Sequence, residues 1–265
     1  MLDLRLQMSI FIEVIPIFVD QVVADLMAAY QALSINNQIM VGLGLQTINR
    51  RALKAIHRDI SIHHFDRAFD LLSQSKVIIK TDLILGLPFE TKASWLDLLE
   101  YISEKMRYGF NYLSLAVLRL LPGTELKDIG DKCHLTVDTR NFDHFVYSTP
   151  DMPRSDFVDC LRISCVAFRL FHTEKDEERL GLRNFYFEIK DRLRIPHIEI
   201  LEHLAKYLLT VFEGTMSDFA KPDFPNAEHY WYFDSYREIP DLMIRDELQR
   251  MLTERVFQPF SLRRN

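Results

Sequence analysis

IMVGLGLQTINRRALKAIHR, residues 39–58, contains the strand-to-helix turn that decides the fold. Residues 39–45 are an apolar run of the length expected for a buried strand, and a basic helical stretch follows them. A single amide, Gln46, stands at the end of the run, and Arg58 comes twelve positions later. A buried strand that leads into a helix is the repeating unit of parallel α/β sheets. The stretch therefore predicts one such unit, with two polar side chains placed where a ligand could reach them.

The same alternation continues on both sides of this stretch. Buried strands are predicted at residues 9–14, 77–85 and 112–118, with helices between them. The apolar stripes of these helices are Val19, Val22, Val23, Leu26, Tyr30 and Leu33, then Leu53, Ile56, Phe65, Ala68, Phe69 and Leu72, then Trp95, Leu98, Leu99, Ile102 and Met106. The pattern predicts an α/β fold with a parallel sheet and right-handed crossovers, as in doubly wound or barrel folds.

The alternation ends after about residue 135. Ser155 is placed to cap a helix that carries Phe157, Leu161, Phe168 and Phe171, and further helices are predicted over 185–193, 197–212 and 241–255. Residues 214–237 are rich in aromatic residues and are expected to form an irregular connection. We therefore divide the chain into residues 1–135, the sheet-containing part, and residues 136–265, a mostly helical domain.

Composition limits the class of protein. With 265 residues, 48% of them hydrophobic and 26% charged, the chain is expected to be globular. A formal net charge of −6 argues against a dedicated nucleic-acid binder. The apolar runs are too short to span a membrane, and no secretory leader is recognisable. Three cysteines form no even disulfide framework, which favours a reducing, cytoplasmic location.

Candidate binding residues lie near the ends of the predicted strands, where parallel sheets and barrels place their ligands. Glu13 interrupts the first strand, Gln46 follows the second, and Asp82 lies within the third. Ala116 brings a small side chain to the fourth. A carboxylate buried on an apolar strand costs several kcal/mol unless it is paired, so we expect a ligand or a cation beside these acids.

Each of these residues also has a purely structural interpretation. Glu13 could pair with a nearby lysine or cap the helix after Pro16. Arg58 alone is typical of a cation near a helix C-terminus, where the helix dipole favours it. Gly44 and Gly86 could simply permit tight turns. The functional interpretation therefore rests on their occurrence together.

These motifs resemble the second half of the radical S-adenosylmethionine (SAM) barrel. VGLGLQTINRRALKAIHR is similar to that family's GLQS-like strand end and L-x-x-I-x-R helix, and KTDLILGLPFET is similar to its DLI-x-GLP strand. LRLLPGTEL resembles the segment after the last barrel strand, so the resemblance covers about residues 9–125. The subgroup that resembles the chain most is the cobalamin-binding-domain-containing radical SAM proteins with an uncharacterised, helical C-terminal domain.

The resemblance implies a partial (β/α) barrel of about four strands with a SAM pocket. Glu13, Gln46, Arg58 and Asp82 fall at positions similar to SAM-contacting residues, and Ala116 at a position beside the adenine. An arginine can hold the methionyl carboxylate, while the amide and the acids can bond the amino group or the ribose hydroxyls. Which acid meets which group stays open at this point.

The sequence also departs from the family pattern. A [4Fe–4S] cluster needs a C-x-x-x-C-x-x-C loop after the first barrel strand, and this motif is absent. Cys160 and Cys165 diverge around one predicted helix, so we interpret them as core residues, and Cys133 alone cannot hold a cluster. Residues 9–14 resemble the third of six barrel strands. We expect the cluster half, and any cobalamin dependence, to belong to a preceding segment or a separate chain.

Two interpretations follow from this departure. In the first, the chain is the C-terminal fragment of a radical SAM enzyme, inactive in reductive SAM cleavage without its N-terminal half. In the second, it is a cluster-less small-molecule-binding or scaffold module derived from the same fold. The second requires something to cover the open edge of the first strand, for which residues 1–8 are a candidate. No metal-binding set is predicted in the chain.

Overall fold

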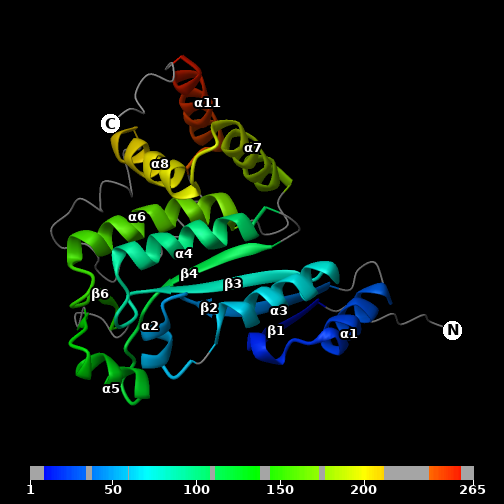
Figure 1. The fold of residues 1–265 in the computed structure, drawn as a ribbon, viewed down its shortest axis with the longest axis vertical. Helices are drawn as coiled ribbons and strands as arrows, with labels where there is room; N and C mark the ends of the chain where they lie inside the picture. Colours follow the sequence, from blue (N-terminus) through cyan, green and yellow to red (C-terminus); the bar gives the residue numbers. More distant parts are fainter. Residues whose placement is uncertain are drawn as a thin grey trace.

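Four parallel strands form the centre of the protein, which is represented by a computed structural model (Figure 1). The structure describes residues 9–33, 38–58, 60–107, 111–137, 144–172, 177–211 and 239–257. The strands are β1 (Ser9–Val14), β2 (Gln38–Gln46), β3 (Ile78–Leu85) and β4 (Tyr112–Val117), and they pair in sequence order. The predicted α/β class and the predicted parallel sheet are confirmed.

Helices connect these strands, and local sequence explains where each begins. After the 3₁₀ turn η1 (Pro16–Phe18), Asp20 caps α1 (Gln21–Ala32). Asn49 caps α2 (Arg50–Ala55), and Ser61 caps α3 (Ile62–Gln74). Thr91 and Ser94 form a reciprocal capping box at α4 (Lys92–Lys105). Each cap accepts a hydrogen bond from a backbone N–H that the helix itself leaves unpaired.

The two faces of the sheet differ. Side chains alternate along a strand, so residues two apart share a face. One face carries the core, including Val41 and Leu43 of β2 and Ile79 and Leu83 of β3, all 0% exposed. The predicted stripes of α3 and α4 are buried in the same hydrophobic cluster. The other face carries small, polar or partly exposed side chains, and it is this face that bears the predicted site residues.

The prediction of a buried strand at residues 9–14 is wrong in one respect. The strand forms, but each of its residues is half-buried or exposed, and Phe11 is 51% exposed. Within the part of the chain that the structure describes, β1 pairs only with β2, so it is an edge strand. An edge strand with one open face has fewer neighbours to pack against, so the apolar side chains of β1 stay partly exposed.

A short segment after β4 has structure that the sequence reading did not identify. Thr124 caps α5 (Glu125–Lys132), and a small antiparallel pair, β5 (Thr136–Val137) and β6 (Val146–Ser148), follows. Backbone hydrogen bonds join Val146 to Leu118 and Leu120 to His144, so this segment is attached at the end of β4.

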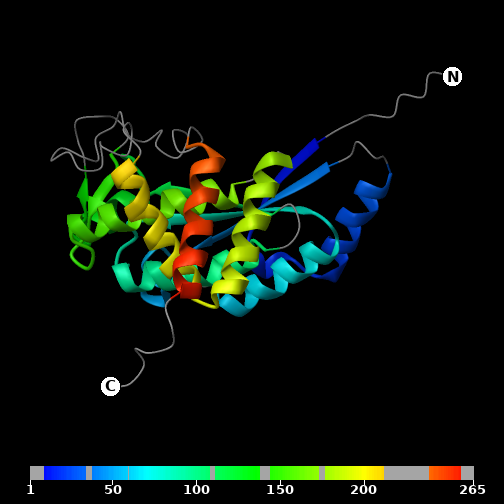
Figure 2. The ribbon, with the colours of Figure 1, turned by 90° about the horizontal axis from the view of Figure 1, so that it is seen from above.

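The second half is helical, as expected. α6 (Arg154–Phe171) packs against α4 and β4, and α7 (Glu177–Leu193), α8 (His197–Val211) and α11 (Asp241–Phe257) form a further layer over α6 (Figures 1 and 2). Ser155 is not the cap of α6, because the helix begins at Arg154 and Pro153 occupies the cap position. Proline at that position restricts the backbone angle φ but has no side-chain hydrogen-bond acceptor.

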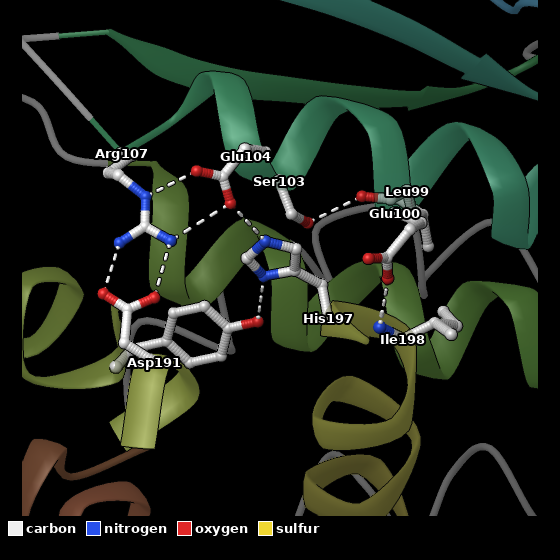
Figure 3. A network of polar contacts seen from close by, with 9 residues as sticks. Leu99, Glu100, Ser103, Glu104, Arg107, Asp191, His197 and Ile198 are labelled. Carbon is white, nitrogen blue, oxygen red and sulfur yellow. Dashed lines mark hydrogen bonds and ion pairs between the residues drawn. The ribbon is translucent and has the colours of Figure 1, made fainter. Parts of the chain in front are cut away.

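A buried histidine links the helical layer to α4 (Figure 3). His197 Nε2 lies 2.9 Å from a carboxylate oxygen of Glu104, and Nδ1 lies 2.8 Å from the Tyr186 hydroxyl oxygen. Arg107 pairs with Glu104 and also with Asp191 of α7. Burial lowers the pKa of His197. A neutral ring can then donate from Nε2 to Glu104 and accept at Nδ1 from Tyr186, which satisfies both ring nitrogens.

The hydrophobic cluster is continuous from the sheet helices through α6 to α8, so the domain boundary near residue 135 stays a prediction. The aromatic segment 214–237 and residues 1–8 lie outside the described residues. Among the helices that the structure does describe, none combines the length and the apolar character needed to cross a bilayer.

Candidate binding site

A hollow of about 340 Å³ opens at the carboxyl ends of β1, β2 and β3. Four of the five predicted site residues line it, namely Glu13, Gln46, Arg58 and Asp82. Ala116 does not line it, although the pairing of Ile84 with Ala116 places that residue on the same sheet face one strand further on. Residues that are up to 69 positions apart in sequence therefore converge at one place.

The end of β2 has an unusual backbone that directs Gln46 into the hollow. The pairing with β3 shifts register between Gly44 and Gln46, and Gln46 has φ +64°. This left-handed conformation is uncommon for a residue other than glycine. It turns the amide back over its own strand, so that a Cβ added at Gly44 would lie 2.5 Å from Gln46 Nε2. The amide of Gln46 thus occupies the space that a side chain at position 44 would fill.

Arg58 reaches the same point from the following loop. After α2 the chain reverses at His57, which has φ +55°, and the Arg58 N–H donates to the Leu53 carbonyl oxygen at 2.9 Å. This arrangement terminates the helix and returns the chain toward the sheet. Nη1 of Arg58 lies 3.5 Å from the Cβ position of Gly44. The amide and the guanidinium thus meet above one glycine.

Glu13 lies on the other side of the floor of the hollow. A Cβ at Gly42 would lie 3.2 Å from Glu13 Cγ and 3.2 Å from Phe11 Cζ, so these two side chains pack over that glycine. Glu13 is exposed. The expectation that a buried Glu13 must be paired is therefore wrong, because the open face of the edge strand leaves this carboxylate in contact with solvent.

Asp82 has a partner within the chain. Lys80 Nζ lies 2.9 Å from an Asp82 carboxylate oxygen, with both side chains about a quarter exposed. Lys80 also stands over the Phe11 ring, 5.5 Å from its centroid. The cation expected beside Asp82 is thus present as Lys80. A ligand is not needed to neutralise this acid, although Asp82 can still accept hydrogen bonds from one.

Gln46 is the residue that most clearly lacks a partner. Its side chain is 7% exposed, and in the described structure Oε1 is buried with no hydrogen-bond partner. A buried amide oxygen without a donor costs about 1–3 kcal/mol. A ligand N–H or O–H group in the hollow would supply that donor. Arg58 and Glu13 place opposite charges on either side of the hollow.

A buried carboxyl group holds the loop that follows Gln46. Glu90, 0% exposed, accepts hydrogen bonds from the hydroxyls of Thr47, at 2.5 Å, and Ser94. Asn49 Nδ2 donates to the Phe89 carbonyl oxygen at 2.8 Å. Burial raises the pKa of Glu90, against the effect of these hydrogen bonds. The loop after β2 is thereby tied to the loop after β3, which stabilises the turn at Gln46.

Two of these features were missed at the level of sequence. Lys80 follows the alternation of β3 and so shares a face with Asp82, which the period of two could have revealed. Thr47 and Glu90 form a pair between two loops, and nothing in the spacing of 43 residues signals it.

The cysteines do not fit an iron–sulfur cluster. Cys160 and Cys165 are both buried in α6, as predicted, and burial raises the pKa of the Cys160 thiol to about 12. Both thiols lie inside the hydrophobic cluster. Within the residues that the structure describes, no three His, Cys, Asp or Glu side chains are grouped to hold a metal ion.

No protein-family model matches the chain, and no curated protein matches it. Among solved structures, the archaeal Methanocaldococcus infernus Elp3 is 16% identical, over 62% of this chain and 34% of its own, with a TM-score of 0.45. The radical SAM methyltransferase TsrM from Kitasatospora setae is 19% identical, over 51% and 26%, with a TM-score of 0.41. Coproporphyrinogen III oxidase (HemN) from Escherichia coli, a radical SAM enzyme, is 18% identical, over 67% and 38%, with a TM-score of 0.44. The chain thus spans 26–38% of the length of these structures.

Proposed function

We propose that this chain binds S-adenosylmethionine in the hollow at the ends of β1, β2 and β3. One observation carries the proposal. The amide of Gln46 and the guanidinium of Arg58 meet above Gly44, and Gln46 Oε1 is a buried acceptor without a partner in the described structure. A side chain held in a strained conformation with an unsatisfied acceptor is typical of a ligand site rather than of a packing position.

The chemistry of the lining suits an α-amino acid with a nucleoside attached. Arg58 can hold a carboxylate through two parallel hydrogen bonds, and Gln46 Oε1 can accept from an ammonium group. Glu13 and Asp82 are acceptors for the ammonium group or for ribose hydroxyls. The resemblance of residues 9–125 to the radical SAM barrel supports this ligand, because it assigns SAM contacts to the same four side chains. We propose that Ala116, beyond the hollow on the same face, lies beside the adenine.

The role that we propose for this chain is binding and orientation, not electron transfer. Its cysteines do not fit a [4Fe–4S] cluster, and no residue of the hollow is a thiol. The cluster and any cobalamin would belong to an N-terminal half, carried upstream or on a separate polypeptide. With that half, the protein would be a radical SAM enzyme of cytoplasmic location; this chain by itself would be inactive in SAM cleavage.

The surface beside β1 supports such a partner. Phe18 of η1, Val22 and Leu26 of α1, and Leu33 just after α1 are 67–73% exposed. The ribbon of α1 lies on the β1 side of the sheet (Figure 1). Exposed apolar side chains near an unpaired strand edge are typical of an interaction surface. A further strand and helix, parallel to β1 and α1, would cover both features.

A second function remains because the chain holds no cluster motif. As a cluster-less module, it would bind a small molecule without redox chemistry, and the misfit of Cys160 and Cys165 favours this alternative. The two functions differ in their need for a partner. The enzyme requires cluster cysteines supplied by another segment, whereas the module binds its ligand alone and retains no iron in any assembly.

Isothermal titration calorimetry with SAM tests the proposed ligand. We expect saturable binding by the wild-type chain and a loss of about 2–4 kcal/mol in Arg58→Ala, because the charge-assisted contact of Arg58 with the methionyl carboxylate is lost. Arg67→Ala, an exposed arginine on α3, is the matched control and should bind SAM as the wild type does. Equal affinities in Arg58→Ala and wild type would contradict the assigned role of Arg58.

A further inference from the structure

A second hollow, of about 820 Å³, adjoins the first and shares Arg58 with it. Its lining is mainly basic. Four of its residues carry or can carry a positive charge, and they lie at one end of β2 along α2 and the turn after it, namely Arg50, Lys54, His57 and Arg58. Leu53 and Ile60 are its apolar wall, and both are buried.

Among the described residues, one acidic side chain, Glu125, pairs with a basic residue of this hollow. Within the described part of the chain, no Asp or Glu lines it, and Arg50, Lys54 and Arg58 form no ion pair there. Glu125 of α5 pairs with His57, with 3.3 Å between Nδ1 and Oε1. Arg50 and Lys54 are four residues apart on α2, a spacing at which like charges repel. In a chain with a net charge of −6, such a concentration of cations is not explained by overall composition.

Arg51, the remaining basic side chain of α2, points away from the hollow. Arg51 follows Arg50 directly, but its guanidinium stacks over the Phe89 ring, 4.6 Å from the centroid. It does not line the hollow. The basic lining is therefore formed by one face of residues 50–58, whereas Arg51 is held against Phe89.

We propose that this basic hollow binds the phosphate group of a small-molecule substrate. A phosphate offers three strong acceptor oxygens and a charge of about −1.5 to −2 at neutral pH, which matches several cations better than one carboxylate does. Arg58 lies between the two hollows, so a phosphorylated molecule bound here would lie next to the ligand of the first. Its description as a substrate rests on the proposed function, whereas the anion site itself does not.

Calorimetric titration with inorganic phosphate at low ionic strength tests this site, because salt would screen it. We expect saturable binding by the wild-type chain, weakened at least about tenfold in Arg50→Gln/Lys54→Gln, since two charge-assisted contacts are lost. Arg67→Gln, outside the hollow, should change the affinity less than about twofold, as an exposed charge that does not line the site does. Thermal unfolding of each variant establishes that it is folded, and SAM affinity should be unchanged in the double variant.

Three results would overturn the phosphate site: no saturable phosphate binding by wild type, equal weakening in Arg67→Gln, or tighter binding of succinate than of phosphate. Preferential, steeply salt-dependent binding of a single-stranded RNA would also overturn it, in favour of a nucleic-acid surface. If phosphate binds as expected while SAM does not bind, the anion site stands and the proposed function fails. The two proposals are thus tested separately.

Discussion

At the scale of single residues, Gly44 has the most specific role. Strand interiors disfavour glycine, because it contributes no packing and loses much conformational freedom on folding. Here the absence of a side chain gives room to the amide of Gln46, which folds back across the strand. The glycine therefore has a packing reason, since its missing side chain leaves the space that the Gln46 amide occupies.

Gly44→Ala should separate binding from stability. The added methyl group would lie 2.5 Å from Gln46 Nε2, the far end of a flexible side chain, so the amide can move away without disrupting the sheet. We expect the free energy of unfolding to change by less than about 1 kcal/mol, since alanine restricts the unfolded chain. SAM affinity should fall at least about tenfold, because the displaced amide loses its hydrogen bond to the ligand.

Chemical denaturation and calorimetry measure the two quantities on the same preparation. The control is Gly181→Ala on α7, far from the hollow in sequence, where an added Cβ would lie 3.1 Å from Arg245 Nη2. Undiminished SAM affinity in Gly44→Ala would mean that Gln46 does not contact the ligand.

At the scale of elements, α1 shows how a correct helix can have an unexpected orientation. The stripe identified in the sequence included Val22, Leu26 and Leu33, and these are 70–73% exposed. The buried side of α1 is formed by Ala24 and Met27. The period of the pattern predicted the helix, but the apolar residues encircle it, so the pattern could not tell which side packs on β2.

Val22→Lys/Leu26→Lys tests whether this flank is a binding surface. We expect the free energy of unfolding to change by no more than about 0.5 kcal/mol, as for other surface substitutions. Self-association of the isolated chain and binding of a hydrophobic dye should both decrease, because the exposed apolar area is interrupted. Sedimentation velocity and dye fluorescence measure these effects.

Ser73→Lys/Gln74→Lys, on exposed positions of α3, adds the same charge elsewhere and is the control. If both double variants reduce self-association equally, net charge rather than the α1 flank is responsible. A large loss of stability in Val22→Lys/Leu26→Lys would show that these side chains are packed.

At the scale of the whole molecule, stability depends on polar contacts between helical layers as well as on the core. Glu104 of α4 is contacted by Arg107 and His197. Burial works against its ionisation, but these hydrogen bonds prevail and lower the pKa of Glu104 to about 2. His197 also has a lowered pKa, because its burial disfavours the charged ring. Both side chains are therefore more easily deprotonated in the folded protein than in the unfolded chain.

Stability should therefore decrease toward acid pH. Glu104 contributes fully above its unfolded pKa, near 4.5, and its contribution is lost as the pH falls toward about 2. The contribution of His197 declines as the pH falls below its unfolded value of 6.5. Urea unfolding at several pH values should show that the free energy of unfolding decreases in two successive steps as the pH falls. Glu104→Gln should reduce the step below pH 4.5.

Glu188→Gln, an exposed carboxylate on α7, is the matched control. If the free energy of unfolding falls equally steeply below pH 4.5 in wild type and in Glu104→Gln, the proposed contribution of Glu104 to the pH dependence is wrong. Because Glu104 is about half exposed, high salt should reduce its effect.

The sequence by itself determined the order of strands and helices and the positions of the four polar residues near the strand ends. These follow from hydrophobic period, caps and the rule that parallel strands end at one edge, all of which operate over a few residues. The resemblance to a known barrel named the same residues, and the structure places Glu13, Gln46, Arg58 and Asp82 around one hollow.

Only the tertiary structure decided how those residues are arranged. The register shift that turns Gln46 over Gly44 and the buried contact of Thr47 with Glu90 depend on what packs against each strand and loop. The exposure of the α1 flank likewise depends on which neighbours are present. The register shift joins strands whose paired residues are 37–38 positions apart, and Thr47 and Glu90 are 43 apart. No local pattern specifies such contacts, because a short window of sequence contains only one of the two partners.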